Sequence, residues 1–319
     1  MQWQCIPDVE RQCCEQFSAA PLRWGNPPGH DVEPCHDAMT HTYEATNSTT
    51  KGVTMIDNQL KGRVALVTGA GDGLGQGIAR RFAQAGAAVL IAEFDDVKGQ
   101  AAADSIVSDG GRAAFVHCDI TDKSQMDSAV QTAVDEFGSI DILVNNAYRS
   151  WGLHRVEDKT DEEYEANFAM NVLGPNWAMK KAFPVMKAQQ WGRIINISSL
   201  NGVNAHMGTA AYNASKEALR ALTRTAAREW APYGITANII CPAVASAAYR
   251  NFAALQPNAA AATDAAIPMG RMGDAEADLG GVAVFLASED STYLTGNTLF
   301  VDGGSHINGS PWDPHLPER

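Results

Sequence analysis

Short runs of apolar residues alternate with amphipathic stretches from residue 63 onward. The runs cover residues 63–68, 87–94, 113–119, 141–147, 192–199, 235–243 and 297–304. Their nearly continuous hydrophobicity is typical of strands buried on both faces of a parallel sheet. Between the first two runs, Leu74, Ile78 and Phe82 recur at every fourth position and predict an amphipathic helix. The pattern predicts an α/β fold in which a doubly wound parallel sheet of seven strands has helices on both faces.

This alternation does not extend to the first part of the chain. Residues 1–54 are polar and rich in Pro and Thr, and four of the six cysteines lie there. A zinc site that uses these cysteines is an alternative, but their spacing fits no common zinc pattern. We expect residues 1–54 to be a poorly structured leader and Met55 to be the natural start. Residues 55–319 are expected to form one domain, because the intervals between strands are too short for a second.

Charge and hydropathy argue against several classes of partner. The chain has 319 residues, 45% of them hydrophobic and 19% charged, and a formal net charge of −13. No basic block offsets this charge, which argues against nucleic acid and anionic membranes as partners. No apolar run reaches the roughly 18 residues of a membrane span, and the first residues lack a secretory signal. We expect a cytoplasmic protein and predict no metal site.

The first apolar run continues directly into the glycine-rich segment TGAGDGLGQG, residues 68–77. A loop of this kind between a strand and a helix lets backbone N–H groups approach a diphosphate at the helix N-terminus. The spacing is T-G-x-x-x-G-x-G, through Thr68, Gly69, Gly73 and Gly75, rather than G-x-G-x-x-G. A flexible turn is the other interpretation, and a nucleotide-binding loop is the prediction.

Tyr212 and Lys216 stand four residues apart in AAYNASKEAL, residues 210–219, so on a helix they share one face. Taken alone, a tyrosine in such a helix is usually a packing residue. A lysine ammonium 5–6 Å from a phenol, however, stabilises the phenolate by about 3 kcal/mol at an effective dielectric constant near 20. Other motifs of the chain are needed to choose between a packing role and a catalytic role for Tyr212.

Several motifs, in one order along the chain, resemble the short-chain dehydrogenase/reductase family in its single-domain form. They are TGAGDGLG, CDITD at residue 118, NNA at 145, NVLG around Asn171, NISS at 196, YNASK at 212 and VDGG at 301. The resemblance covers nearly everything after residue 55. It implies a Rossmann-like sheet of order 3-2-1-4-5-6-7 and an NAD(P)-dependent oxidoreductase.

The resemblance also implies four catalytic roles. Tyr212 is the expected base, which accepts the hydroxyl proton of an alcohol while a hydride leaves the carbon. Lys216 and the positive ring of NAD⁺ are expected to lower the pKa of the Tyr212 phenol from its usual value of about 10. Ser199 would orient the substrate oxygen, with Ser198 as its structural neighbour. Asn171 would hold a water that completes a proton relay.

The second predicted strand ends in Glu93, which indicates NAD rather than NADP. A carboxylate at this place accepts hydrogen bonds from ribose hydroxyls and repels a 2′-phosphate. Neither Asp72 nor Phe94 offers a cation for such a phosphate. Together with these residues, the resemblance implies a cofactor-binding set of Gly69, Asp72, Gly73, Leu74, Gly75, Glu93, Asp119, Ile120, Asn146, Ala147, Tyr212, Lys216, Pro242 and Val244.

Three positions depart from the family pattern. NNA is followed by Tyr148 where the family usually has glycine, and Pro242 is followed by Ala243 instead of glycine. The family's threonine five residues after that proline falls at Ala247. We expect cofactor binding to survive, with a locally altered pocket.

The segment of residues 244–268 takes the position of the family's variable substrate lid. Candidate substrate contacts are Tyr148, Trp151, His206 and Tyr249. An apolar lining suits a hydrophobic secondary alcohol or ketone, including cyclic ones such as steroids, terpenoids or alicyclic compounds. The alternative is that these residues only pack the lid onto the domain.

We therefore predict an NAD-dependent oxidoreductase that interconverts a secondary alcohol and a ketone. One alternative is a carbonyl reductase that works mainly towards the alcohol. Another, from a different class, is a catalytically silent NAD-binding redox sensor. By the resemblance, a homotetramer or homodimer is expected, with contacts through residues 160–190 and 213–230.

Overall fold

The computed structural model describes residues 58–149 and 152–307 of the chain. The leader predicted at residues 1–54, the proposed start at Met55 and the substrate candidate Trp151 lie outside the described residues. All described residues belong to a single unit of the chain. The boundary between a leader and a domain stays a prediction.

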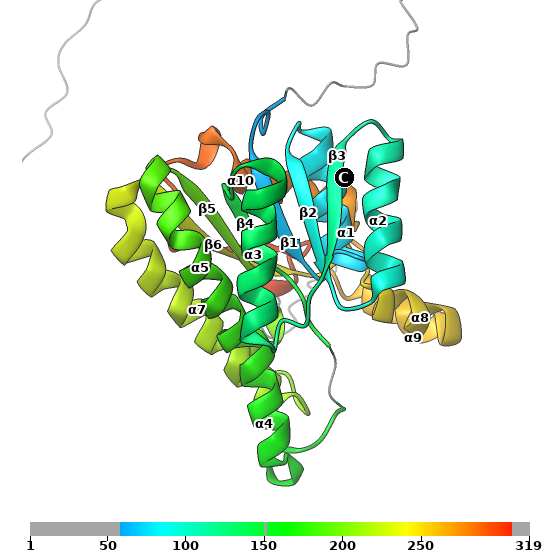
Figure 1. Cartoon of the computed structure of the whole chain (residues 1–319). Coiled ribbons are helices and arrows are strands. Elements are labelled where there is room, and N and C mark those ends of the chain that lie inside the picture. Colours follow the sequence, from blue (N-terminus) through cyan, green and yellow to red (C-terminus); the bar gives the residue numbers. More distant parts are fainter. Residues whose placement is uncertain (1–57, 150–151, 308–319) are drawn as a thin grey trace, which may run out of the picture. The chain divides into compact units, whose positions relative to one another are not determined.

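Within the described residues, seven parallel strands form one sheet in the order β3-β2-β1-β4-β5-β6-β7 (Figure 1). The strands are β1 (Val64–Thr68), β2 (Ala88–Glu93), β3 (Arg112–His117), β4 (Ile142–Asn145), β5 (Gly192–Ile197), β6 (Ile235–Pro242) and β7 (Thr298–Val301). The predicted strands and their order are confirmed. Because the order reverses between β1 and β4, a crevice is expected at the C-terminal ends of these two strands.

Helices cover both faces of the sheet. One face carries α1 (Gly73–Gln84), α2 (Asp96–Ser108) and α10 (Gly280–Ala287), and the other carries α3 (Lys123–Phe137), α5 (Gly174–Gln189) and α7 (Ala210–Trp230). Figure 1 shows α3, α5 and α7 in front of the sheet. Successive side chains of β1 alternate between the two cores: Val64 and Leu66 pack with the second group of helices, and Ala65 and Val67 with the first. This is why the strand is apolar at every position.

The remaining elements are short. They are α4 (Asp161–Phe168), α6 (Leu200–Val203), α8 (Ala247–Leu255), α9 (Pro257–Ala265), the π-helical turns η2 (Ala169–Leu173) and η4 (Ala275–Leu279), and the 3₁₀ turns η1 (Val156–Asp158), η3 (Ala231–Tyr233), η5 (Glu289–Ser291) and η6 (Ser305–Ile307). In Figure 1, α4, α8 and α9 lie at the lower end of the sheet.

The amphipathic helix predicted after the glycine-rich segment is α1. Asp72 caps its N-terminus by accepting a hydrogen bond from the Gly73 N–H at 2.6 Å. Ile78 and Phe82 are fully buried, while Leu74 is partly buried against the same core. The helix therefore begins at the glycine-rich loop and directs its N-terminus at the crevice.

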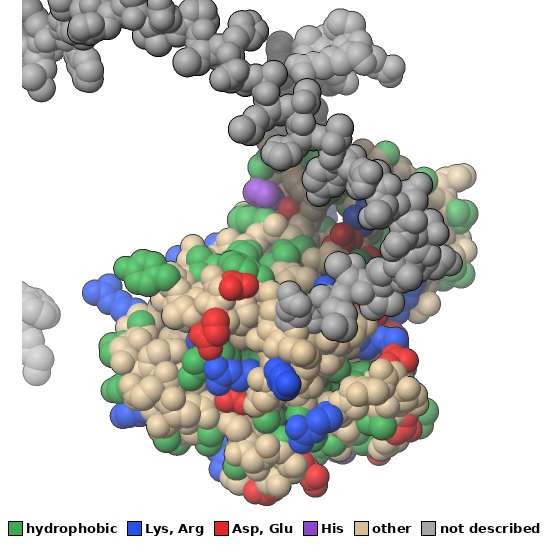
Figure 2. Space-filling view, turned by 90° about the horizontal axis from the view of Figure 1, so that it is seen from above, with side chains coloured by type: hydrophobic (Ala, Val, Ile, Leu, Met, Phe, Trp, Pro, Cys, Tyr) green, Lys and Arg blue, Asp and Glu red, His purple; other side chains and the backbone are tan. Residues whose placement is uncertain are grey.

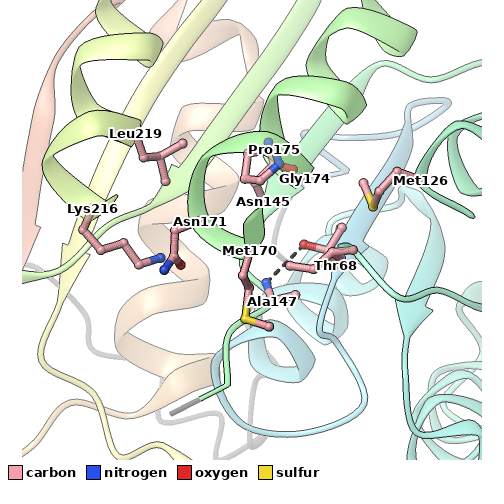
Figure 3. Close-up of a pocket in the computed structure, with 11 residues that line it drawn as sticks. Thr68, Met126, Asn145, Ala147, Met170, Asn171, Gly174, Pro175, Lys216 and Leu219 are labelled. Atoms are coloured by element: carbon pink, nitrogen blue, oxygen red, sulfur yellow. Dashed lines mark hydrogen bonds between the residues drawn. The ribbon is translucent and has the colours of Figure 1, made fainter. Parts of the chain in front are cut away.

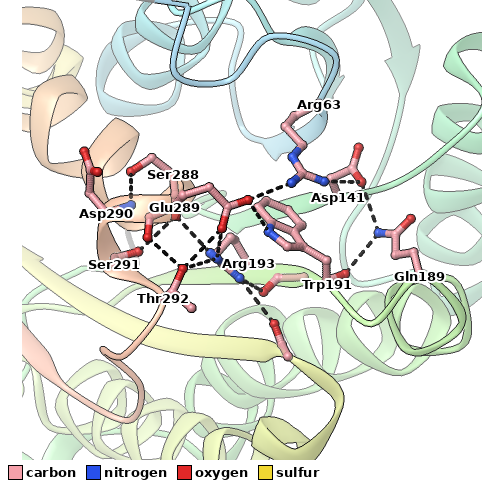
Figure 4. A network of polar contacts seen from close by, with 12 residues as sticks. Arg63, Asp141, Gln189, Trp191, Arg193, Ser288, Glu289, Asp290, Ser291 and Thr292 are labelled. Carbon is pink, nitrogen blue, oxygen red and sulfur yellow. Dashed lines mark hydrogen bonds and ion pairs between the residues drawn. The ribbon is translucent and has the colours of Figure 1, made fainter.

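A polar network lies at the N-terminal ends of the strands, away from the crevice (Figure 4). Arg193 of β5 is 1% exposed and donates a hydrogen bond to the Ser288 carbonyl at 3.2 Å. Its guanidinium lies 4.2 Å from the centroid of the Trp191 ring, and that of Arg63 lies 3.6 Å from the same ring. Burial lowers the pKa of Arg193, and the nearby Glu289 carboxylate opposes this shift. The network anchors β5 at the end away from the crevice.

Charged side chains of both signs share the molecular surface. Figure 2 shows acidic and basic side chains next to one another on the coloured part of the face it presents. None of the described helices has the length and apolarity needed to cross a membrane.

Candidate active site

A cleft of about 950 Å³ opens where β1, β2, β4, β5 and β6 end. This volume lies at the upper end of the usual range for small-molecule sites. Predicted cofactor residues that line it are Gly69, Asp72, Gly73, Leu74, Glu93, Asp119, Ile120, Asn146, Ala147, Tyr212, Lys216, Pro242 and Val244. The tertiary structure thus gathers residues from 69 to 244 around one elongated space.

The glycine-rich loop leaves no room for side chains where it folds against β4. A Cβ at Gly75 would lie 2.3 Å from the Gly69 carbonyl oxygen and 2.5 Å from Asn146 Nδ2. Gly69 has a φ of +64°, and a Cβ there would lie 2.6 Å from Ala147 Cα. Asn146 Nδ2 donates to the carbonyls of Thr68 and Gly69 at 2.9 and 3.0 Å. Gly75 itself does not line the cleft. The close-packed glycine-rich loop at the start of α1 fits the diphosphate of a dinucleotide.

Asp72 lies at the mouth of the cleft. Its Oδ1 accepts hydrogen bonds from the Gly73 N–H and from Arg250 Nη2, the latter at 2.7 Å. Arg250 belongs to α8, 178 residues further along the chain. Lys98 Nζ lies 4.0 Å from the other Asp72 oxygen. Lys98 and Arg250 thus place two positive charges beside Asp72, although the sequence motif itself contains no cation. Neither residue could be connected to Asp72 from a local sequence pattern.

Glu93 ends β2 with its carboxylate folded onto neighbouring backbone. Its Oε2 accepts from the Gly71 N–H at 3.0 Å, and its Oε1 accepts from the Phe94 and Asp95 N–H groups at 2.9 and 3.2 Å. A carboxylate offers about four acceptor positions, so it can still accept a hydrogen bond from a ribose hydroxyl. These bonds hold the carboxylate beside the glycine-rich loop.

The residues proposed for catalysis meet at the other end of the cleft. Ser199 caps the short helix α6, where its Oγ accepts a hydrogen bond from the Asn201 N–H at 3.2 Å, and it lines the cleft together with Tyr212. Lys216 is 3% exposed, and its Nζ donates to the Ile197 carbonyl at 2.8 Å. The same nitrogen lies 5.6 Å from the centroid of the Tyr212 ring. Ser198, the expected structural neighbour, is buried and donates to the Lys216 carbonyl at 3.2 Å.

Burial dominates the titration of the tyrosine and the lysine. It raises the pKa of the Tyr212 hydroxyl, and the hydrogen bond from Ser199 opposes this shift. Burial also lowers the pKa of Lys216 to about 7. The cost of burying a phenolate is the main cause of the raised pKa of Tyr212. These shifts describe the chain without cofactor, so the predicted lowering of the Tyr212 pKa by Lys216 together with the NAD⁺ ring stays a prediction.

Asn171 lies in the π-helical turn η2 and is 1% exposed. Its Nδ2 donates to Ser215 Oγ at 3.0 Å, while its Oδ1 is buried without a hydrogen-bond partner among the described residues. Asn171 and Lys216 border a cavity of about 10 Å³, which is close to the size that holds one water. Figure 3 shows these two side chains pointing toward one another. The unpartnered Asn171 oxygen and the Lys216 ammonium beside this small cavity fit a bridging water.

Buried amides attach α7 to the sheet beneath these residues. Asn145 Nδ2 of β4 donates to Asn196 Oδ1 of β5 at 2.8 Å, and Asn196 Nδ2 donates to Thr223 Oγ1 of α7 at 2.8 Å. Sequence reasoning assigned no role to this chain of hydrogen bonds. The available signal was an asparagine inside two apolar strands, since a buried amide needs partners.

Of the substrate candidates within the described residues, only Tyr148 lines the cleft. Its ring is 4.7 Å from that of Tyr212, and it is 43% exposed. The Tyr249 hydroxyl instead donates to Asp264 Oδ1 of α9 at 2.6 Å, which ties the two lid helices together. His206 is exposed outside the cleft. The structure therefore does not bring Tyr249 and His206 to the cleft with Tyr148.

Within residues 58–149 and 152–307, no group of three or more His, Cys, Asp or Glu side chains is arranged to hold a metal ion. Cys118 and Cys241 are buried free thiols, and burial raises their pKa values to about 12 and about 11. Both thiols are therefore protonated at neutral pH.

Comparisons with known proteins agree with this geometry. A family model described as enoyl-(acyl carrier protein) reductase matches residues 69–306. Galactitol 2-dehydrogenase from Agrobacterium fabrum is 38% identical over 260 residues, which cover 78% of this chain and 100% of that protein.

Two solved structures have nearly the same fold. NAD⁺-bound xylitol dehydrogenase has a TM-score of 0.73 and 32% identity, and the match covers 77% of this chain and 100% of that chain. A putative NAD(P)-dependent gluconate 5-dehydrogenase from Beutenbergia cavernae, with NADP bound at low occupancy, has a TM-score of 0.72 and 35% identity. That match covers 79% of this chain and 99% of that chain.

Proposed function

The chain belongs to the short-chain dehydrogenase/reductase family, and from that premise we propose that it is an NAD-dependent enzyme interconverting a secondary alcohol and a ketone. The observation that carries this proposal is the meeting of Tyr212, Lys216 and Ser199 in one cleft with the glycine-rich loop. One end of the cleft offers a cradle for a diphosphate, and the other offers groups that move a proton. A dinucleotide connects two such ends.

NAD⁺, when bound, supplies the acceptor for the hydride that leaves the alcohol carbon. The Tyr212 oxygen takes the proton of the alcohol hydroxyl, so that the carbon–oxygen double bond forms. Ser199 Oγ donates a hydrogen bond to the substrate oxygen and keeps it within reach of Tyr212. In the reverse direction, Tyr212 returns the proton to the ketone oxygen.

The proton then leaves the site through the residues behind Tyr212. The Lys216 ammonium favours the phenolate, and it faces the cavity that Asn171 borders. Asn171 Oδ1, which is buried and unpartnered, accepts a hydrogen bond from a water in that cavity. Lys216 and this water together carry the proton from Tyr212 towards solvent.

Glu93 supports NAD over NADP as the cofactor. Its carboxylate is held at the end of β2 by backbone N–H groups, where it would repel a 2′-phosphate. The carboxylate of Asp72 pairs with the nearby Arg250 at 2.7 Å and lies 4.0 Å from Lys98, which offsets part of their positive charge. Related structures hold NAD⁺ in one case and NADP in another, so family membership alone supports both cofactors.

The ring of Tyr148 beside Tyr212 supports a hydrophobic substrate, including cyclic alcohols, because an aromatic wall favours a C–H face. The names of the relatives point instead to polyhydroxy compounds, namely galactitol, xylitol and gluconate. A second candidate function is a carbonyl reductase. The raised pKa of Tyr212 favours it, because a protonated phenol is the acid that ketone reduction needs.

We also propose a homotetramer or homodimer located in the cytoplasm. Exposed apolar side chains on the segment of residues 160–190 support an interface there, since Phe168 is 36% and Leu173 is 44% exposed. Light scattering of the purified protein tests the oligomeric state. A monomer at micromolar concentration would contradict it.

The activity is tested with NAD⁺ or NADP⁺ and a panel of cyclohexanol, a hydroxysteroid and galactitol, followed by absorbance of the reduced cofactor. Tyr212→Phe should lower turnover by about 10²–10⁴-fold, with the affinity for NADH unchanged. Unchanged turnover in this variant would remove Tyr212 from the mechanism. NADH binding without turnover of any alcohol or ketone would support the silent redox sensor instead.

A further inference from the structure

Arg250 and Asp72 join the lid helix α8 to the N-terminus of α1. One oxygen, Asp72 Oδ1, accepts hydrogen bonds from the Arg250 guanidinium at 2.7 Å and from the Gly73 N–H at 2.6 Å. The other terminal nitrogen of Arg250 donates to the Ala245 carbonyl at 3.0 Å. The guanidinium is therefore held over the start of α8, in contact with a carboxylate that lines the cleft.

The groups around Asp72 are those of an anion site. A helix N-terminus carries about half a positive charge, and α1 directs its N-terminus at this carboxylate. An arginine offers planar N–H donors that match phosphate oxygens. Lys98 Nζ lies 4.0 Å from Asp72 Oδ2 and adds a second cation. Three positive centres thus surround one side-chain carboxylate.

At the start of α8, the chain lacks a phosphate contact that the family pattern would supply. The family's lid threonine falls at Ala247, which has no hydroxyl to offer a phosphate. The backbone nitrogen of Ala247 would lie 3.6 Å from a Cβ built on Gly73, so the start of α8 meets the glycine-rich loop. Arg250 is one turn further along α8 and reaches back to this junction.

We propose that Arg250 binds the diphosphate of the dinucleotide cofactor. On cofactor binding, the guanidinium exchanges the Asp72 carboxylate for diphosphate oxygens, and α8 thereby docks on the bound cofactor. In the absence of cofactor, Asp72 holds Arg250 at the mouth of the cleft. This inference rests on the proposed function, because it requires a dinucleotide in the cleft.

The test compares a ligand that contains the diphosphate with one that does not. ADP-ribose is titrated by calorimetry, and adenosine by ligand-observed NMR, into the full-length wild type and Arg250→Gln. The substitution should weaken ADP-ribose about tenfold, as expected for one charge-assisted hydrogen bond, and leave adenosine within about twofold. Asp72→Asn keeps a side-chain acceptor at the cap and removes the competing charge. It should bind ADP-ribose at least as tightly as the wild type.

Arg271→Gln is the matched control. The side chains of Arg271 and Arg250 are 53% and 51% exposed. Arg271 pairs at 2.6 Å with Asp278, which does not line the cleft, whereas Asp72, the partner of Arg250, does. Amide hydrogen exchange of α8 is the second readout. ADP-ribose should slow this exchange in the wild type and in Arg271→Gln, but not in Arg250→Gln.

Two results would overturn the inference while leaving the proposed function standing. In the first, Arg250→Gln binds ADP-ribose as tightly as the wild type does. In the second, ADP-ribose and adenosine lose equal affinity, which would indicate a general disturbance of the cleft. A wild-type protein that binds neither ligand would overturn the proposed cofactor as well, so the two failures are distinguishable.

Discussion

Tyr148 packs its ring on that of Tyr212, with 4.7 Å between the centroids and 47° between the planes. Tyr148 stands where the family usually has glycine, so this contact is a feature of this chain. Burial is the main cause of the raised pKa of Tyr212, and Tyr148 also raises it. The aromatic contact thus connects the shape of the cleft to the acidity of the proposed base.

Tyr148→Gly should move the pH dependence of alcohol oxidation to lower pH by about one unit. Without the ring, water reaches the Tyr212 phenolate, so the pKa of Tyr212 falls and the base is available at lower pH. The measurement is the pH profile of kcat/KM. Tyr148→Phe keeps the ring but loses the hydroxyl whose charge also raises the pKa of Tyr212, so its profile should move less than that of Tyr148→Gly. A midpoint that does not move in Tyr148→Gly would contradict the role of the ring.

Lys216 should make the stability of the folded protein rise between about pH 7 and pH 10. Burial lowers the folded-state pKa to about 7 from the usual value of 10.5. Between these values the unfolded chain binds more protons, so the free energy of unfolding increases with pH. Urea unfolding of the wild type and of Lys216→Met over this range measures the difference. The variant should lack this rise, whereas replacing the exposed Lys61 by Met should retain it.

Gly75→Ala should weaken NADH binding about tenfold and lower Tm. The added Cβ would meet the Gly69 carbonyl oxygen at 2.3 Å, which forces the loop away from β4. Overpacking of this kind typically costs about 1–3 kcal/mol. Gly281→Ala in α10 is the control, because no atom lies within 4 Å of its Cβ position. Equal NADH affinity in the two variants would show that the loop tolerates a side chain.

Glu93→Gln should lower the preference for NAD over NADP about tenfold. The substitution removes the negative charge that opposes a 2′-phosphate and leaves a polar side chain of the same size. The ratio of kcat/KM for the two cofactors measures the effect. Asp96→Asn serves as control, since the side chain of Asp96 is 69% exposed and pairs with His117 outside the cleft. A ratio that stays at its wild-type value in Glu93→Gln would argue against this role.

Arg193→Met should destabilise the fold by about 2 kcal/mol without changing cofactor affinity, because it leaves buried carbonyls unpaired. The Ser288 and Gly192 carbonyls both accept hydrogen bonds from this side chain. Urea unfolding followed by circular dichroism measures the loss. Arg112→Met changes an exposed arginine in β3, at the edge of the same sheet, and should cost little. Equal stability of the two variants would show that the polar network of Figure 4 does not stabilise the fold.

The strands were predictable because a parallel sheet leaves a strong local signal. Val64, Ala65, Leu66 and Val67 are all buried, so the run is apolar without alternation. The glycine spacing was equally informative, since only glycine fits where backbone approaches backbone. By contrast, Asn145 and Asn196 were noted only as parts of the NNA and NISS motifs, and their hydrogen-bond partners became visible only in the folded chain.

Local patterns in the chain predicted the strands and the helix after the glycine-rich segment, because periodicity and spacing depend on near neighbours. The resemblance to a family added the strand order and the candidate site residues. They could not specify how those side chains titrate or which charges pair. The pKa of Tyr212 depends on how completely α7 and the strands exclude water, and Arg250 reaches Asp72 across 178 residues of sequence. Desolvation and long-range pairing are properties of the packed molecule, so only the tertiary structure decides them.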